Sequence, residues 1–355
     1  MKTIETKITK LLYELIETPS LSKNEGNAAA LIQKFLKKEK IPFETRANNT
    51  WAKNKYFNFL KPTILLNSHI DTVKPVNGWT KEPYKAIFED DKLFGLGVND
   101  AGAALVCLLG TFLHFYDQED LKYNFIFAAT AEEEISGKNG IEILRDIVST
   151  CNLAIVGEPT EMEMAVAEKG LMVIDAEVKG KSGHAARNEG VNAIYVALKD
   201  LVWIENYQFR KINPYLGPVK CTVTMINAGT QHNVIPDSCK YVIDIRTTPE
   251  YTHEQILEVL KDNLKADITP RSTRLNPSAI DNEHDIVRAA HKIGINTFGS
   301  ATLSDQALIN IPSVKMGPGK SERSHTADEF IYVKEIEHGL EIYIKLLSQL
   351  VLSSN

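Results

Sequence analysis

The chain has 355 residues, of which 43% are hydrophobic and 24% charged, and its formal net charge is −6. This length indicates a large domain with a second one, and the composition is that of a soluble globular protein. The negative charge and the lack of a basic stripe with interleaved aromatic residues argue against a nucleic-acid partner.

The N-terminal residues 1–20 repeat apolar residues at helical spacing with Lys and Glu between them, unlike the continuous apolar core of a signal peptide. No apolar stretch approaches the roughly 20 residues of a membrane helix, so no membrane partner is expected. The four cysteines are far apart and form no C-x-x-C pair, which predicts buried free thiols: Cys107, Cys151, Cys221 and Cys239. A cytoplasmic location is therefore expected.

The first half of the chain alternates apolar runs with amphipathic stretches. Apolar spacing predicts helices over 5–18 and 25–39, and Ser22 stands three residues before Glu25 as in a capping box. Three strands and two further helices follow, at 63–68, 123–129 and 152–156 and at 101–115 and 138–148. Strands alternating with helices predict an α/β domain with a mainly parallel sheet and helices on both faces.

The pattern changes near residue 170. An alternating strand at 171–179 precedes a helix, two strands and a helix, at about 190–204, 219–228, 238–246 and 253–264. This order predicts a small α+β domain of ferredoxin-like type with an antiparallel sheet. Helix, strand and helix patterns then return at 282–294, 312–316 and 333–351. We expect a discontinuous catalytic domain, 1–170 and 279–355, with an inserted domain at 171–278.

Polar residues follow several of the predicted strands. His69, Asp71, the Glu132–Glu134 run and Glu158 all lie just past the ends of apolar runs. Ligands of parallel sheets bind beyond the carboxyl ends of the strands, so these residues are expected at one edge.

His69 and Asp71 form a His-x-Asp pair at the end of the 63–68 strand. Residues two apart in a strand point the same way, so Asp71 can stand behind the imidazole and accept its second N–H. The imidazole is then oriented as a metal ligand. The alternative for this pair alone is a surface turn.

Asp100 follows Gly95-Leu96-Gly97 and precedes a run of small residues that opens a helix. One carboxylate can bridge two metal ions about 3.5–4 Å apart. The alternative is an ordinary helix N-cap. A dinucleotide loop is excluded, because the third glycine is missing and Asp100 would repel a pyrophosphate.

The Glu132-Glu133-Glu134 run is the most specific feature. Neighbouring carboxylates repel one another unless cations are near, and in an extended segment adjacent side chains point to opposite sides. The alternative is a solvated acidic loop. Glu158, before Pro159, and His325 in Ser324-His325-Thr326 complete the candidate ligands.

In this order, these residues resemble the M20 metallopeptidase family, which includes aminoacylases, carboxypeptidases, succinyl-diaminopimelate desuccinylase and acetylornithine deacetylase. The resemblance runs from Glu17-Thr18-Pro19-Ser20 to His325. It implies two divalent ions, zinc or cobalt. The residues implied for the first ion are His69, Asp100 and Glu158, and those for the second are Asp100, Glu134 and His325. Asp71 is implied as the support of His69, and Glu133 as the general base.

One departure concerns the acidic run, where the family usually has Asp-Glu-Glu and this chain has Glu132-Glu133-Glu134. The register of the roles is thus open by one residue. We choose Glu133 and Glu134, because Thr130-Ala131 is similar to the Thr-Ala that precedes the family's motif.

In the inserted domain, Gly183-His184 looks like a family signature in which a histidine reaches across a homodimer and stabilises the oxyanion. Asn233 and Arg246 stand in family-like segments, and the arginine is similar to one that receives the substrate carboxylate. A turn residue is the alternative for His184, and a strand-edge salt bridge is an equal alternative for Arg246.

The resemblance implies a hydrolase that cleaves the amide of a small N-acyl amino acid. Glu133 would take a proton from water and deliver it to the leaving amine. N-acetyl- or N-succinylornithine deacylation in arginine biosynthesis is the preferred function. Succinyl-diaminopimelate desuccinylation and a dipeptidase or general aminoacylase activity are alternatives. A non-catalytic metal- or ligand-binding protein is the alternative of another class, although it would have no need for Glu133 beside complete ligands.

Overall fold

The structure is a computed structural model, and it describes residues 1–352 of the chain. The chain divides into two compact units. Unit 1 comprises residues Met1–Val166, Ala279–Phe298 and the chain from Ser304 onward, and unit 2 comprises Ala167–Ser278 and Gly299–Leu303. We describe each unit by itself.

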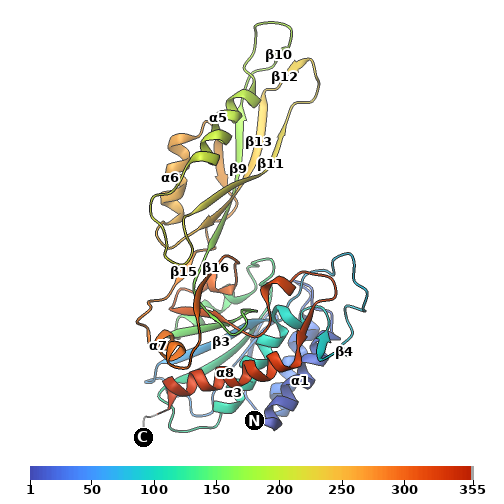
Figure 1. The fold of residues 1–355 in the computed structure, drawn as a ribbon, viewed down its shortest axis with the longest axis vertical. Coiled ribbons are helices and arrows are strands. Elements are labelled where there is room, and N and C mark those ends of the chain that lie inside the picture. Colours follow the sequence, from blue (N-terminus) through green and yellow to red (C-terminus); the bar gives the residue numbers. More distant parts are fainter. Residues whose placement is uncertain (353–355) are drawn as a thin grey trace. The chain divides into compact units, whose positions relative to one another are not determined.

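A nine-stranded sheet forms the centre of unit 1 (Figure 1). Its order is β1-β2-β6-β3-β7-β17-β8-β15, and β16 also pairs with β8. β6 and β7 both pair in parallel with β3, and β17 continues the parallel set beside β7. The strands are β1 (Glu44–Arg46), β2 (Asn49–Lys53), β3 (Thr63–His69), β6 (Asn124–Thr130), β7 (Leu153–Gly157), β8 (Met164–Glu168), β15 (Ser278–Ala279), β16 (Thr297–Ser300) and β17 (Ser313–Met316). The central strands β3, β6 and β7 are buried throughout, as the predicted parallel sheet requires.

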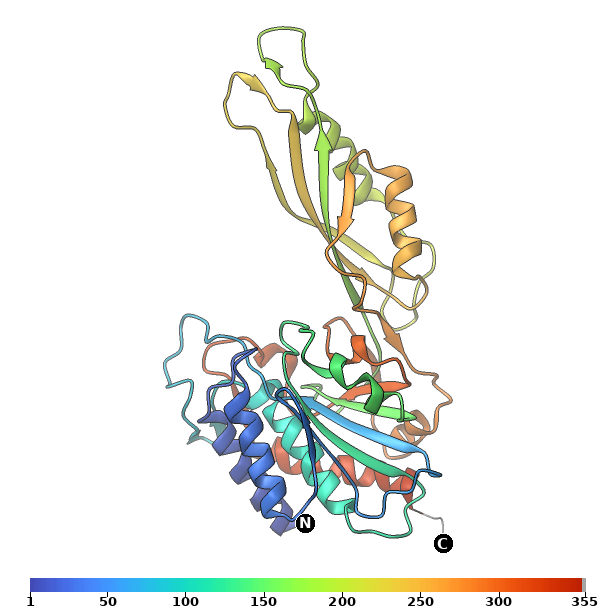
Figure 2. The ribbon, with the colours of Figure 1, turned by 180° about the vertical axis from the view of Figure 1, so that it is seen from behind.

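Helices cover both faces of this sheet. α3 (Ala103–Phe115) packs against β3, β6 and β7 and lies between α1 (Lys2–Ile16) and α8 (Val333–Val351). Figure 2 shows the short α4 (Arg145–Val148) on the opposite face. The other helices are α2 (Gly26–Lys38) and α7 (Asp285–Lys292), with short helical turns at Val98–Gly102, Ile141–Leu144, Asp305–Leu308 and Ser321–Arg323. The mainly parallel α/β prediction is confirmed.

Two local predictions differ from the structure. The helix expected over 138–148 is a tight helical turn followed by the single turn of α4. The capping box expected from Ser22 and Glu25 is absent, because α2 begins at Gly26 without a side-chain cap. Ser22 instead donates its hydroxyl to Asp71, and the buried Glu25 accepts the N–H of Lys23.

Within the described residues, one helical stretch, Val98–Phe115, is long and apolar enough to cross a membrane by length and composition alone. Of this stretch, 78% is buried inside the protein. Its position between the sheet and the helices α1 and α8 accounts for the apolar composition as that of a core helix.

A second, three-stranded sheet lies in unit 1, in the order β18-β5-β4. Its strands are β4 (Ile87–Glu89), β5 (Lys92–Phe94) and β18 (Phe330–Tyr332). β18 follows the segment that carries His325, and β5 precedes the loop that carries Asp100. Asp100 and His325, two candidate ligands that are distant in sequence, therefore lie on segments that adjoin the same small sheet.

Unit 2 is an antiparallel sheet with two helices packed on it. Its chain order is β9 (Gly170–Lys179), α5 (Ala193–Asn206), β11 (Lys220–Ala228), β13 (Ser238–Thr247), α6 (His253–Asn263) and β14 (Asp267–Pro270). The strand order is β11-β13-β9-β14, and all pairs are antiparallel, which matches the ferredoxin-like expectation. A two-stranded antiparallel sheet of β10 (Gly183–His184) and β12 (Val234–Ile235) is separate from this sheet.

The first boundary between the units differs slightly from the expected 170/171, whereas the second lies between Ser278 and Ala279. The first change falls between Val166 and Ala167, and residues 299–303 return to unit 2. Contacts within unit 2 explain the return: Lys169 donates its N–H to the Ser300 carbonyl, and a side chain at Gly299 would collide with Tyr215.

Candidate active site

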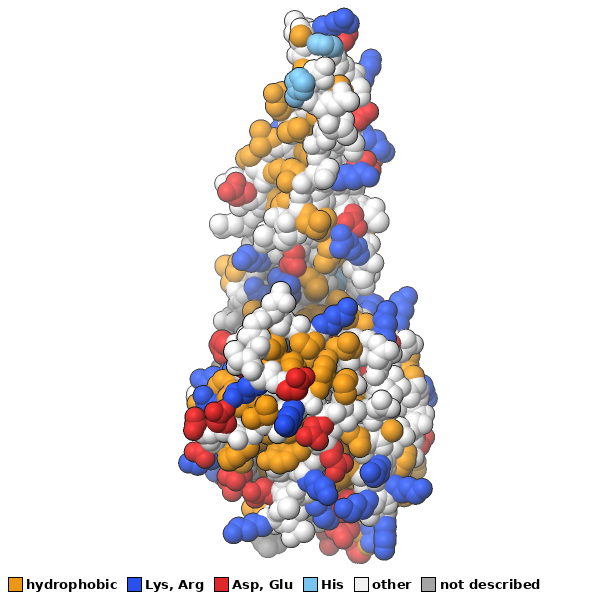
Figure 3. Space-filling model, turned by 90° about the vertical axis from the view of Figure 1, so that its right-hand side faces the viewer, with side chains coloured by type: hydrophobic (Ala, Val, Ile, Leu, Met, Phe, Trp, Pro, Cys, Tyr) orange, Lys and Arg blue, Asp and Glu red, His pale blue; other side chains and the backbone are white. Residues whose placement is uncertain are grey.

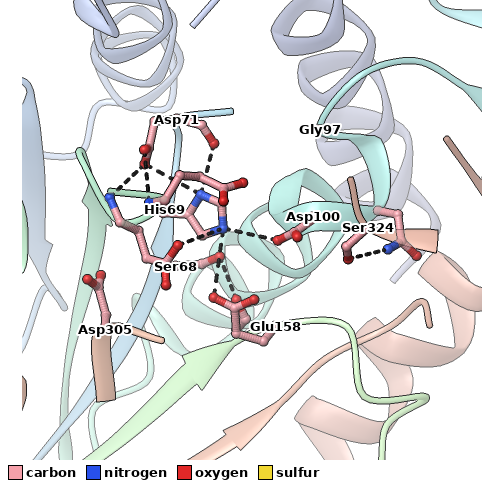
Figure 4. Close-up of polar contacts among 12 residues, drawn as sticks. Ser68, His69, Asp71, Gly97, Asp100, Glu158, Asp305 and Ser324 are labelled. Atoms are coloured by element: carbon pink, nitrogen blue, oxygen red, sulfur yellow. Dashed lines mark hydrogen bonds and ion pairs between the residues drawn. The ribbon is translucent and has the colours of Figure 1, made fainter. Parts of the chain in front are cut away.

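The site lies at the carboxyl edge of the central sheet, where β3, β6 and β7 end (Figure 4). His69 is the last residue of β3, and its side chain is only 1% exposed. Its Nε2 atom lies 3.3 Å from Asp100 Oδ1 and 3.7 Å from Glu158 Oε1. A buried strand end thus presents one imidazole nitrogen to carboxylates from two other elements.

Asp71 fixes the orientation of this imidazole. The His69 Nδ1 atom lies 2.9 Å from the Asp71 carbonyl oxygen and 3.5 Å from its carboxylate Oδ1. The imidazole thus contacts the Asp71 carboxylate, as expected, and lies still closer to the Asp71 backbone carbonyl. The Asp71 carboxylate also accepts the N–H groups of Glu133 and Glu134, at 3.0 and 3.2 Å. One buried aspartate thus positions both the ring and the acidic run.

Asp100 stands between the two histidines. Its Oδ1 faces His69, and its Oδ2 lies 3.5 Å from His325 Nε2. The segment before it is irregular: Gly97 has a φ of 75°, and a side chain there would collide with Thr72. The alternative of an ordinary helix N-cap does not apply, because the N-cap of α3 is Gly102. The two carboxylate oxygens are therefore available to two different sites.

Glu133 and Glu134 both face the cluster. Glu133 Oε2 lies 4.0 Å from His69 Nε2, and Glu134 Oε2 lies 3.0 Å from His325 Nε2. The run is a tight turn rather than an extended segment, since Ser136 N–H donates to the Glu133 carbonyl. Glu132 has a φ of 54°, and its carboxylate accepts from Asn139. Of the three glutamates, it is Glu132 that points elsewhere.

Burial and crowding determine the charge of the cluster. Burial, with the nearby Glu158, raises the pKa of Glu133 well above its usual value, and burial also raises the pKa of Glu158. Burial lowers the pKa of His69, but the hydrogen-bonding Asp100 and Asp71 outweigh it and hold the pKa well above its usual value. The hydrogen bond to Glu134 raises the pKa of His325 to about 9. Protons bound to these groups reduce the repulsion among the carboxylates. Bound cations would reduce the same repulsion in their place.

The donor atoms fit divalent metal ions. The ligand atoms of His69, Asp100 and Glu134 lie within 4.8 Å of one another, as do those of His69, Glu133 and Glu158. Oxygen and nitrogen ligands lie about 2.0–2.2 Å from a zinc ion, so small adjustments close either set around one. Glu158 Oε1 is buried and has no hydrogen-bond partner among the described residues. A mixture of imidazole and carboxylate with an unpartnered buried oxygen suits such an ion.

The remaining predicted site residues lie in unit 2. His184 is in β10, directly opposite Val234, and the neighbouring Ala185 donates its N–H to the Asn233 carbonyl. Arg246 in β13 donates its Nε to Asp244 at 2.8 Å, which is the strand salt bridge weighed as its alternative. The structure thus brings His184 and Asn233 together at one small two-stranded sheet and places Arg246 in the four-stranded sheet of unit 2.

Sequence reasoning did not identify two buried carboxylates near the cluster. Asp305 accepts hydrogen bonds from Asn67 and Thr130, at 2.9 and 2.7 Å, near the ends of β3 and β6. Glu329 accepts three backbone N–H groups around Asp100, and burial together with Asp100 raises its pKa to about 8. Neither residue lies in a recognisable local motif. Each is an acid next to an apolar segment, and this is the sequence signal that could have identified them.

Asp305 leads to a prediction about stability. Burial raises its pKa from 3.8 to about 6, against the hydrogen bonds from Asn67 and Thr130. The folded chain therefore holds this proton more tightly than the unfolded chain, and the resulting stability is present below pH 3.8 and is lost as the pH rises through 6. We expect Asp305→Asn to raise the free energy of unfolding by about 1–3 kcal/mol at pH 8, and by less at pH 5.

Urea denaturation at the two pH values measures this difference. Asp200→Asn is the control, because that buried carboxylate accepts two backbone N–H groups and the Tyr241 hydroxyl, and its replacement should bring no gain. An Asp305→Asn protein that is less stable than the wild type at pH 8 would contradict the prediction.

Comparison with known proteins decides the family. The model of peptidase family M20/M25/M40 matches residues 65–349. The chain belongs to this family. It is thus a metal-dependent hydrolase of amide bonds, and the non-catalytic alternative is set aside.

Relatives extend the family assignment over the whole chain. The acetylornithine deacetylase of Proteus mirabilis is 26% identical, and the alignment covers 97% of both proteins. The structure of the aminopeptidase PepT from Bacillus cereus superposes with a TM-score of 0.81, at 21% identity over 98% of each chain. The YXEP protein of Bacillus subtilis, a dinuclear metal binding peptidase of family M20, gives a TM-score of 0.72 at 17% identity over 98% of each chain.

Proposed function

We propose that this M20 hydrolase removes the acyl group from an N-acyl amino acid, with N-acetyl- or N-succinylornithine as the substrate and a place in arginine biosynthesis. The observation that carries the proposal is Glu133, a half-buried carboxylate beside His69 and Glu158 at the same edge of the sheet as Asp100. The similarity to an acetylornithine deacetylase along 97% of the chain supports the substrate class.

We assign the ion ligands as two sets that share one carboxylate. Asp100 is common to both, with its two oxygens directed at His69 and His325. The first set is His69, Asp100 and Glu158, and the second is Asp100, Glu134 and His325. Bound divalent ions, for which we propose zinc, would supply Lewis acidity and lower the pKa of a water molecule.

Glu133 carries the proton in this proposal. Because Asp71 accepts its backbone N–H, the residue is held beside His69 without itself being needed as a ligand. Its carboxylate takes the proton of the attacking water and then delivers it to the leaving nitrogen, so the products are a carboxylate and a free amino acid. No serine or cysteine nucleophile takes part.

Unit 2 supplies the other proposed contacts. We assign His184 to the oxyanion and Asn233, next to the strand that pairs with β10, to the substrate. Arg246 would receive the substrate carboxylate in place of Asp244, since both are planar partners for its guanidinium group. All three assignments rest on the family resemblance.

We also propose that the protein forms a homodimer. Large apolar side chains are exposed along α5 and the edge strand β11, and Figure 3 shows hydrophobic side chains gathered along unit 2. Tyr195, Leu198 and Met225 are 69%, 54% and 64% exposed. A contiguous exposed apolar surface marks an interaction site, and a second copy would cover it. The four free cysteines suit the proposed cytoplasmic location.

A peptidase activity is the second candidate, because the structure of an aminopeptidase superposes over 98% of the chain. A substrate panel separates the two. We expect N-acetyl- and N-succinylornithine to be hydrolysed with zinc or cobalt, and the activity to be lost to a chelator and regained with metal. N-acylated citrulline, lysine and diaminopimelate, together with di- and tripeptides, complete the panel. Hydrolysis confined to peptides would refute the deacylase, and full activity of metal-free protein would refute the ion assignment.

A further inference from the structure

Two of the three residues assigned to the second ion, Asp100 and His325, lie on separate loops of unit 1. Asp100 follows an irregular segment after Gly95, and His325 lies between Lys320 and β18. His325 has a φ of 58°, and its side chain is 53% exposed, so its own packing does little to hold it. Its position therefore depends on how the segment 320–329 is attached.

Glu329 attaches this segment to the Asp100 loop. Its Oε1 accepts the N–H groups of Asn99 and Asp100, at 2.8 and 3.0 Å, and its Oε2 accepts the N–H of Gly97 at 2.9 Å. The Glu329 carbonyl oxygen also accepts the N–H of Gly95. Glu329 is 2% exposed, so water does not compete for these bonds. One carboxylate satisfies the loop N–H groups that no strand or helix pairs.

Asn99 makes the reverse attachment. Its side chain is fully buried and bonds both backbone groups of Lys320, accepting from N–H and donating to the carbonyl, each at 3.0 Å. Its amide also lies 3.3 Å from the Ser324 hydroxyl. Gly319 makes room for it, because a side chain there would collide with Asn99 Oδ1. A buried side chain of each loop is thus hydrogen-bonded to backbone groups of the other loop.

We infer that Glu329 and Asn99 form a reciprocal latch that sets the spacing between Asp100 and His325 and thereby the affinity of one of the two ion sites. Both are positioning residues, since neither is a ligand. The inference rests on the ligand assignment proposed above. Partners that orient metal ligands in this way change metal affinity by about 10–100-fold when they are replaced.

The choice of Glu329→Gln follows from the hydrogen bonds. A Gln amide has one oxygen, which can still accept from Asn99 and Asp100, but its nitrogen would face the N–H of Gly97, donor against donor. Asp328→Asn is the matched control. That neighbouring side chain undergoes the same change from carboxylate to amide, but it accepts from Thr80 and Lys81 and does not touch the Asp100 loop.

The experiment titrates Zn²⁺ into metal-free full-length protein, with competing chelators, by calorimetry. Wild type should bind two ions, and Glu329→Gln should bind one of them about 10–100-fold more weakly and leave the other within about threefold. Asp328→Asn should match the wild type at both sites. Asn99→Ala should weaken the same ion as Glu329→Gln, and the double variant should show less than the product of the two effects.

Each outcome has one meaning. A wild type that binds fewer than two ions contradicts the proposed ion assignment and not the latch. Two ions bound by Glu329→Gln with wild-type affinity overturn the latch, as does equal weakening of both ions. Circular dichroism checks folding first. If Glu329→Gln does not fold, then Asn99→Ala decides, and unchanged affinity in that variant also overturns the latch.

Discussion

Glu133→Gln is expected to lower kcat by about 10²–10⁴-fold while two ions stay bound. The amide keeps the size of the side chain, but it cannot accept the proton of the attacking water. The backbone N–H of residue 133 can still donate to Asp71, so the support of His69 remains. Steady-state rates with the best substrate of the panel, together with the metal content of the purified protein, measure both halves of this expectation.

Glu132→Gln and Glu134→Gln are the matched controls, and they also settle the register of the acidic run. Glu132 accepts hydrogen bonds from Asn139 and lies away from both histidines, so its variant should keep activity within about tenfold of the wild type. Glu134→Gln removes a ligand beside His325 and should lower the metal content. If Glu132→Gln strongly lowers kcat and Glu133→Gln leaves it near the wild-type value, the general base is Glu132 and the register of the acidic run shifts by one residue.

Mixed dimers are expected to regain activity that neither parent has. His184→Ala alone should lower kcat by about 10²–10³-fold, the usual loss for one oxyanion donor. If His184 serves the partner subunit, a dimer of one Glu133→Gln and one His184→Ala chain contains one site with both groups intact. Subunits exchanged at equal amounts should then reach about a quarter of the wild-type rate, because half of the dimers are mixed.

The same mixture distinguishes the alternatives. If His184 serves its own subunit, every site in a mixed dimer lacks one group, and the rate stays at the level of the parents. A chain that is monomeric at assay concentrations gives the same flat result, so sedimentation of each parent is measured first. A monomeric wild type would contradict the dimer that the exposed residues of α5 and β11 support.

The acidic run shows where local reasoning from the sequence failed. Adjacent side chains were expected on opposite sides, as in a strand, yet Glu133 and Glu134 both face the histidines. The chain turns there, and Asp71 holds both N–H groups of the turn. The choice of Glu133 and Glu134 rather than Glu132 came from the similarity of Thr130-Ala131, a resemblance and not a physical rule.

The sequence by itself determined the elements and the edge at which the site lies. Apolar runs such as 63–68 predict buried parallel strands, because the hydrophobic pattern of a strand is a local property of the sequence. A polar residue directly after such a run must lie at the end of the sheet. His69 and Glu158 were found for that reason.

Only the tertiary structure decided which polar atoms meet. The contacts of Glu329 with Asp100, of Asp305 with Asn67 and of Ser22 with Asp71 join residues 229, 238 and 49 positions apart. A hydrogen bond depends on distance and angle between two atoms, and no spacing along the chain encodes it. The packing of the sheet, its helices and the small three-stranded sheet brings these pairs together.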